Sequence, residues 1–162
     1  MSINISPTSL ARHGFADRLA EAVAAAGAPC SLFTLEVTDR VATLPSASTR
    51  AAMQALRDFG FGLSADDFGA GHAGVDRLAS LPFSEVKIDA AFTQLAMEEA
   101  FARKALDACV DIAGRQGLRV VAKGVETPEM WAFVQDLGVD AAQGFLLHRP
   151  TPADAFAAML NA

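Results

Sequence analysis

The chain alternates short runs of apolar and β-branched residues with longer stretches of helical periodicity. Strands that alternate with helices in this way are typical of a parallel sheet whose strands are joined by right-handed crossovers. We therefore predict an α/β fold with about six βα units. The predicted strands are residues 3–5, 31–37, 63–67, 85–89, 119–123 and a segment within 139–147.

The segments between these strands carry apolar residues at helical spacing and recognisable helix starts. Ser46 or Ser48 is placed to cap one helix, and Thr127 followed by Pro128 opens another. Gly27 and Pro29 stop the first long helix. The predicted helices are residues 15–26, a helix that begins at 46 or 48 and ends at 59, a short helix at 75–80, one or two helices within 92–116, residues 128–137, and a terminal helix that begins at 151 or 152.

The composition excludes several classes of protein. The chain has 162 residues, 16.9 kDa and 52% hydrophobic residues, so we expect one globular domain over residues 1–162. The formal net charge of −6 argues against a patch for duplex DNA. No apolar run is long enough to span a bilayer, and the first residues lack the features of a secretory signal. The two cysteines, Cys30 and Cys109, are far apart in sequence, and we expect a cytoplasmic protein with reduced thiols.

Polar side chains are concentrated in or near the predicted strands. The carboxyl ends of parallel strands meet at one face of a β/α fold, so these side chains are expected to lie together. Amide and carboxylate oxygens suit Mg²⁺ or Mn²⁺ better than zinc. We predict a hard-metal site at this face, although a single acid at a strand end is also typical of a helix cap or a loop. The residues concerned are Asn4, Glu36, Asp66, Asp67, Lys87, Asp89, Lys123, Glu126 and Gln143.

A glycine-rich loop, residues 69–74, follows the paired aspartates. Three glycines in six residues allow positive φ angles and a close approach of the backbone to a ligand. The position of the loop directly after Asp66 and Asp67 favours a site loop, and a flexible βα connection is the alternative.

Six motifs carry a resemblance to a known family. In their order and spacing the chain resembles the EAL domains, the β/α barrels of the cyclic-di-GMP (c-di-GMP) phosphodiesterase type, over essentially its whole length. The resemblance implies an incomplete TIM-type barrel, because six βα units are present and a full barrel has eight strands and about 250 residues. The motifs are INISP (3–7), LEVTD (35–39), DDFGAG (66–71), EVKID (85–89), VVAKGVET (120–127) and QGFLLHRP (143–150).

The resemblance also implies roles for individual residues. Active members of the family cleave the cyclic dinucleotide with two divalent cations and an activated water. On this resemblance, Asn4, Glu36 and Asp66 would bind the first cation, and Asp66 would bridge to the second beside Asp67. The expected catalytic residues are Lys87, which would orient the water or the phosphate, Asp67 and Glu126. Gln143 and Arg149 are expected to contact the substrate, with Gln143 and Glu126 also supporting the site.

Three departures from the family pattern bear on activity. The Glu-Ala-Leu strand that gives the family its name would precede INISP and is absent from the sequence, together with one metal-binding glutamate. Lys123 stands where the family has a glutamate linked to the second cation. Asp39 replaces a glutamate that anchors the glycine-rich loop, and His72-Ala73-Gly74 replaces a Tyr-Ser-Ser sequence.

Lys123 is the departure with the clearest physical consequence. An ammonium group beside Asp66 and Asp67 repels a divalent cation and can pair with the two carboxylates in its place. The hypothesis is that Lys123 replaces the second metal, which leaves one Mg²⁺ or Mn²⁺ site. The alternative is a lysine that extends to solvent in a degenerate site.

These observations leave three functions open. The first is a degenerate, inactive EAL domain that regulates c-di-GMP signalling through protein contacts. The second is a c-di-GMP receptor, and the third is a phosphodiesterase with a rearranged site. A barrel that lacks strands has open sheet edges, so we also expect self-association or a protein partner.

Overall fold

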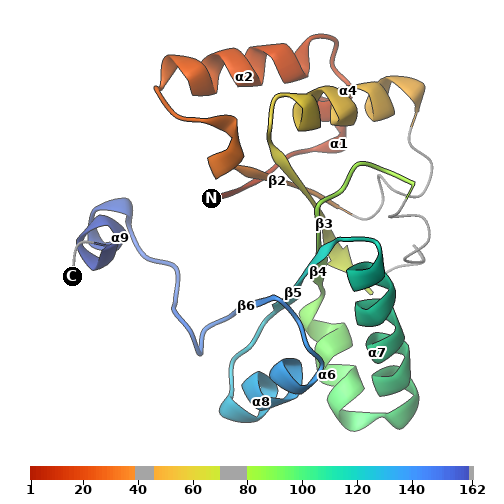
Figure 1. Cartoon of the computed structure of the whole chain (residues 1–162). Coiled ribbons are helices and arrows are strands. Elements are labelled where there is room, and N and C mark those ends of the chain that lie inside the picture. The colour runs from red at the N-terminus through yellow and green to blue at the C-terminus, as the bar shows by residue number, and fades with distance from the viewer. Residues whose placement is uncertain (39–45, 70–79, 161–162) are drawn as a thin grey trace.

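Six parallel strands lie side by side in chain order in the computed structural model, which describes residues 1–38, 46–69 and 80–160. The sheet curls into a half-barrel, with helices along its outer side (Figure 1). This arrangement confirms the predicted α/β fold and the incomplete TIM-type barrel. The strands are β1 (Ser2–Asn4), β2 (Thr34–Thr38), β3 (Gly62–Phe68), β4 (Glu85–Ile88), β5 (Arg119–Lys123) and β6 (Ala141–Gln143).

The helices begin where the sequence provides caps. Ser46 accepts a hydrogen bond from the Thr49 amide at 3.1 Å, and Thr127 accepts one from the Met130 amide at 3.2 Å, so both predicted caps are confirmed. The helices are α1 (Pro7–Leu10), α2 (Phe15–Ala25), α4 (Ala47–Asp58), α6 (Ala90–Glu98), α7 (Ala100–Arg115), α8 (Pro128–Asp136) and α9 (Ala153–Leu160).

Some boundaries differ from the prediction for local reasons. The strand predicted at 31–37 begins only at Thr34, because Cys30–Leu32 forms a 3₁₀ turn after Pro29. The predicted helical region 92–116 is two helices, since Glu99 between them has extended backbone angles. Helix α1 was not predicted, although Ser6 caps it. The predicted short helix at 75–80 lies outside the described residues except for Ser80.

The face of the sheet covered by helices forms the apolar core. Alternate residues of a strand point to opposite faces, and on β2 to β5 one set of alternate positions is apolar, apart from Asp67, which follows the register shift in β3. These residues pack with buried side chains of the helices, among them Met53 and Leu56 on α4 and Leu106 on α7. The strand residues of this set are Leu35, Val37, Leu63, Ala65, Val86, Ile88, Val120 and Ala122.

The opposite, concave face buries polar side chains. Glu36, Ser64, Asp66, Glu85 and Lys87 occupy the other set of alternate positions, and all five are buried. Buried charges are costly unless they are paired, so this face requires specific partners. The polar pattern of the strands therefore indicates that a functional site lies on the concave face.

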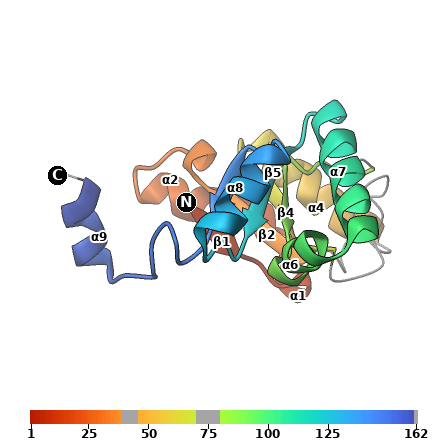
Figure 2. The ribbon, with the colours of Figure 1, turned by 90° about the horizontal axis from the view of Figure 1, so that it is seen from below.

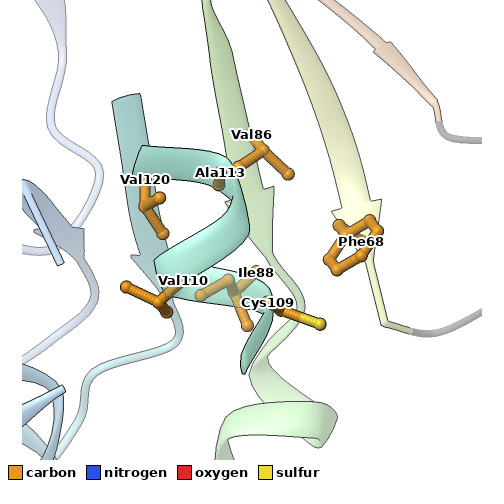
Figure 3. A pocket seen from close by; sticks show the side chains of 7 residues that line it. All are labelled: Phe68, Val86, Ile88, Cys109, Val110, Ala113 and Val120. Atoms are coloured by element: carbon orange, nitrogen blue, oxygen red, sulfur yellow. The ribbon is translucent and has the colours of Figure 1, made fainter. Parts of the chain in front are cut away.

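A small apolar void of about 10 Å³ lies between α7 and strands β3 to β5, on the helix-covered side (Figure 3). Figure 3 shows the side chains of Cys109, Val110 and Ala113 of α7 facing Val86, Ile88 and Val120 of the strands. Burial raises the pKa of the Cys109 thiol above its usual value. The void is too small and too apolar to hold a polar ligand.

Within the described residues, no helix is both long enough and apolar enough to cross a membrane.

Candidate functional site

Strands β2 to β6 bring together six of the predicted site residues on the concave face. They form two clusters, each built around one lysine. The first contains Lys87, Glu36 and Gln143, and the second contains Lys123, Asp66 and Asp67.

The Lys87 cluster is the more deeply buried of the two. The ammonium group of Lys87, on β4, donates a hydrogen bond to the Glu36 carboxylate on β2, and both side chains are buried. A second hydrogen bond, 3.3 Å long, runs to Oε1 of Gln143 on β6. Lys87 thus links its own strand to β2 and β6, through residues that are 51 and 56 positions away from it along the chain. Partners among the described residues use two of the three donors of this ammonium group, which leaves one for a ligand.

The Lys123 cluster lies closer to solvent. Nζ of Lys123, on β5, is 2.8 Å from Oδ1 of Asp66 and 2.8 Å from Oδ1 of Asp67. The exposed fractions of the side chains are 25% for Lys123, 12% for Asp66 and 45% for Asp67. Burial of the ammonium lowers the pKa of Lys123, but the hydrogen bonds and negative charges of the two aspartates together outweigh it. The pKa of Lys123 is therefore raised above its ordinary value, and the lysine is held in its charged form.

A backbone irregularity allows one lysine to reach two consecutive aspartates. Neighbouring residues of a regular strand point to opposite faces, but the pairing of β3 with β4 shifts register between Ala65 and Phe68. Asp67 has a φ angle of 59°, in the left-handed region that aspartate tolerates better than most residues. The bulge therefore turns the Asp67 side chain towards the same lysine as Asp66.

Gly69 supports this bulge from the side of α6. Its φ angle is 97°, and a Cβ atom at this position would lie 2.2 Å from Cδ1 of Phe92. Only glycine satisfies both conditions. The rest of the glycine-rich loop, including His72, lies outside the described residues, as does Asp39.

Four predicted site residues lie outside the two clusters. Asp89 caps α6, where its Oδ1 accepts a hydrogen bond from the Ala91 amide at 2.8 Å. Asn4 is exposed on β1, in register with Glu36 on β2. Glu126 is exposed in the segment between β5 and α8. Arg149 is exposed after β6, and its guanidinium lies 4.5 Å from the centre of the Phe145 ring.

The sequence analysis missed two polar residues of the concave face. Ser64 and Glu85 lie in register with each other on β3 and β4, and Ser64 is also in register with Glu36. Glu85 pairs with Arg119 at 3.3 Å, whereas the buried Ser64 hydroxyl has no hydrogen-bond partner among the described residues. The alternation of polar and apolar residues in strands 63–67 and 85–89 was the signal that could have identified both.

Ammonium groups take up part of the carboxylate surface that a metal would need. Glu36, Asp66 and Asp67 carry three negative charges, and Lys87 and Lys123 return two positive charges. In the described part of the chain, no group of three or more His, Cys, Asp or Glu side chains is arranged to hold a metal ion. The two clusters together thus carry a formal net charge of only −1.

A parallel β/α half-barrel with polar side chains gathered at the carboxyl ends of its strands belongs to the barrel-type α/β domains. The EAL domain model matches residues 1–150 of the chain. The chain therefore belongs to the EAL domain family, as the sequence motifs predict.

Related proteins fit the same assignment. The chain is 31% identical over 156 residues to the cyclic di-GMP phosphodiesterase RocR of Pseudomonas aeruginosa, and the match covers 96% of this chain and 40% of RocR. The structure of the phosphodiesterase MucR from the same organism, in complex with c-di-GMP, superposes with a TM-score of 0.87 at 33% identity. That match covers 96% of this chain and 63% of the MucR chain.

A third related structure was determined with a metal ion. The manganese and c-di-GMP complex of Klebsiella pneumoniae BlrP1 is 32% identical, with a TM-score of 0.83, and the match covers 90% of this chain and 37% of that one. The chain spans only 19% to 40% of the length of the first curated relatives it matches.

Proposed function

We propose that the chain is an EAL-domain module of c-di-GMP signalling that does not carry out two-metal hydrolysis and acts by binding. The observation that supports this most directly is the pairing of Lys123 with both Asp66 and Asp67 at 2.8 Å. In this proposal the lysine supplies, as a fixed side chain, the positive charge that a second cation would supply in an active relative.

Coulomb's law gives the size of the repulsion between the Lys123 ammonium group and a second cation. Two unit charges about 4 Å apart interact with about 4 kcal/mol at an effective dielectric constant near 20, and a divalent ion doubles this. A second Mg²⁺ at Asp66 and Asp67 would have to displace or approach an ammonium group that already neutralises them. The donor set therefore does not fit a second cation.

One cation remains compatible with the site. Asn4 is exposed and in register with Glu36, and the second carboxylate oxygens of Glu36 and Asp66 are not taken up by the two lysines. Oxygen donors of this kind suit Mg²⁺ or Mn²⁺. A bound cation would supply charge for holding a phosphate.

A c-di-GMP receptor is the second candidate, favoured by the residues that are retained. Lys87 and Gln143 meet on the concave face. Hydrogen bonds within the described ranges use two of the three donors of each lysine, which leaves one for a phosphate oxygen. A regulator that acts only through protein contacts would not need these donors. A residual phosphodiesterase is the third candidate.

Calorimetric titration with c-di-GMP, in the presence and absence of Mg²⁺ or Mn²⁺, tests the proposal when it is combined with chromatography of the reaction products. We expect no linear dinucleotide from the wild-type chain. Binding without turnover would identify a receptor, and the absence of binding would favour a regulator that acts through protein contacts. Formation of linear dinucleotide would overturn the proposal.

Lys123→Glu tests the role of the lysine. We expect this substitution to increase Mn²⁺ affinity, measured by calorimetry, because it restores a carboxylate beside Asp66 and Asp67. Lys104→Glu, which makes the same charge change at an exposed position of α7, is the matched control and should leave metal affinity unchanged. Equal metal affinity of the wild type and Lys123→Glu would contradict metal replacement.

A further inference from the structure

Helix α6 begins beside the Lys123 cluster. Figures 1 and 2 both show it directly after β4, between α7 and α8. Asp89 caps its first turn, and the Asp89 amide donates a hydrogen bond of 2.9 Å to the carbonyl of Phe68, the residue that follows the paired aspartates. The start of α6 is therefore tied to the end of β3.

Two side chains of this first turn pack against glycines that follow the cluster residues. Gly69 is the first residue after β3, and a Cβ atom there would lie 2.2 Å from Cδ1 and 2.7 Å from Cγ of Phe92. Gly124 is the first residue after β5, and a Cβ atom there would lie 2.4 Å from Cβ of Ala90. Atoms this close leave no room for a side chain on either glycine, so the turn of α6 rests directly on the backbone of both strand ends.

The strand pairing does not by itself fix the distance between Lys123 and the two aspartates. β4 lies between β3 and β5, so the backbones that carry these side chains are about 9–10 Å apart. The pairing of β4 with β5 ends at Ile88 and Ala122, one residue before Lys123, and the pairing of β3 with β4 shifts register between Ala65 and Phe68. The two hydrogen bonds of 2.8 Å thus join chain segments that lie beyond the regular ladder on both sides.

We propose that the first turn of α6 positions the Lys123 cluster. Phe92 holds the bulge that presents Asp67, and Ala90 holds the end of β5 that presents Lys123. Both are positioning residues, because they act on the backbone of the strand ends and not on the charged groups. A movement of α6 would change the pairing of Lys123, so α6 is the element through which the rest of the fold acts on the candidate site.

The inference concerns the same cluster as the proposed function, but it requires only the hydrogen bonds of Lys123 and not any ligand. It is tested by stability measurements, whereas the proposed function is tested by nucleotide turnover and metal binding. Either can therefore fail while the other stands.

The coupling between Phe92 and Lys123 is the first test. Lys123→Met removes both hydrogen bonds and should lower the urea midpoint of the otherwise wild-type chain. The same substitution should leave the midpoint of Phe92→Ala unchanged, because the pair no longer forms there. Leu106→Ala, which leaves a cavity under α7, is the matched background, and in it Lys123→Met should shift the midpoint as much as in the wild type. An equal shift in the Phe92→Ala background would overturn the proposal.

Phe92→Leu separates positioning from a general loss of packing. Leucine keeps the Cβ, Cγ and Cδ1 atoms, the three atoms of Phe92 that lie nearest to a Cβ on Gly69. In the Phe92→Leu background, Lys123→Met should therefore shift the urea midpoint as it does in the wild type. If the shift is as small as in Phe92→Ala, the contact with Gly69 does not position the cluster.

Ala90→Gly tests the contact with Gly124. It removes the Cβ atom that faces this glycine, so it should weaken the effect of Lys123→Met on the urea midpoint. Ala91→Gly carries the same cost in helix propensity at the next, exposed position of α6, and it should leave that effect at its wild-type size. The same response in both backgrounds would contradict the role of Ala90.

Discussion

On the helix-covered face of the sheet, Leu35, Leu63 and Ile88 are buried among apolar side chains of several helices, whereas the concave face buries Glu36, Asp66 and Lys87. The apolar face is stabilised by many small contacts, and the loss of any one of them lowers the free energy of unfolding only slightly. On the concave face each buried charge depends on one or two named partners. The two faces should therefore respond differently to substitution.

Lys87→Met should have the largest effect on stability. It leaves the Glu36 carboxylate buried without its counter-charge, and we expect the free energy of unfolding to fall by about 3–5 kcal/mol. Urea denaturation measures the change. The double variant Glu36→Gln, Lys87→Met removes both charges and should recover most of the loss. A double variant as unstable as the single one would show that the lysine acts through packing instead.

Leu106→Ala tests the apolar face. Leu106, on α7, is fully buried, and its truncation should lower the free energy of unfolding by about 3 kcal/mol through lost contacts and a cavity. Leu95→Ala on α6, where the side chain is 42% exposed, is the control and should cost less than about 0.5 kcal/mol. Both values come from urea denaturation, and similar losses for the two variants would argue against the burial pattern.

Lys123→Met should cost less than Lys87→Met although it breaks two ion pairs. The Asp67 side chain is half-exposed and the lysine is partly exposed, so water screens the charges, and we expect a loss of about 1 kcal/mol. The loss should shrink further in high salt, when urea denaturation is repeated in 1 M NaCl. A loss as large as that of Lys87→Met would remove the distinction between the two clusters.

Ser64→Ala should have the smallest effect and the opposite sign. It removes a buried hydroxyl that has no partner among the described residues, so we expect the stability to stay unchanged or to rise by up to about 1 kcal/mol. Ser84→Ala is the contrasting control. The Ser84 hydroxyl donates to the Leu63 carbonyl and accepts from the Leu63 amide, and losing it should destabilise the protein by about 1 kcal/mol. Thermal melts of both variants give the comparison, and destabilisation by Ser64→Ala would mean that its hydroxyl is satisfied.

Much of the fold could be predicted from local signals. The β-branched runs, the Ser46 and Thr127 caps and the glycine stops are short-range features, so they placed most strands and helices within a few residues. The early strand start at residue 31 and the omission of α1 have a common cause. Both involve a single turn of helix near a proline, which carries too little periodicity to be detected in a sequence.

The sequence by itself determined that polar residues of several strands, among them Lys87, Asp66 and Lys123, would gather at one face, because the carboxyl ends of parallel strands always share one face. Only the tertiary structure decided how they meet. In a regular strand, successive side chains point to opposite faces, so Asp66 and Asp67 would lie on opposite faces of the sheet. The shifted pairing of β3 with β4 instead brings both to Lys123. The partners of Lys87 are distant in sequence, and the curl of the sheet brings them within reach. Such contacts depend on the positions of whole strands, and no local pattern specifies those positions.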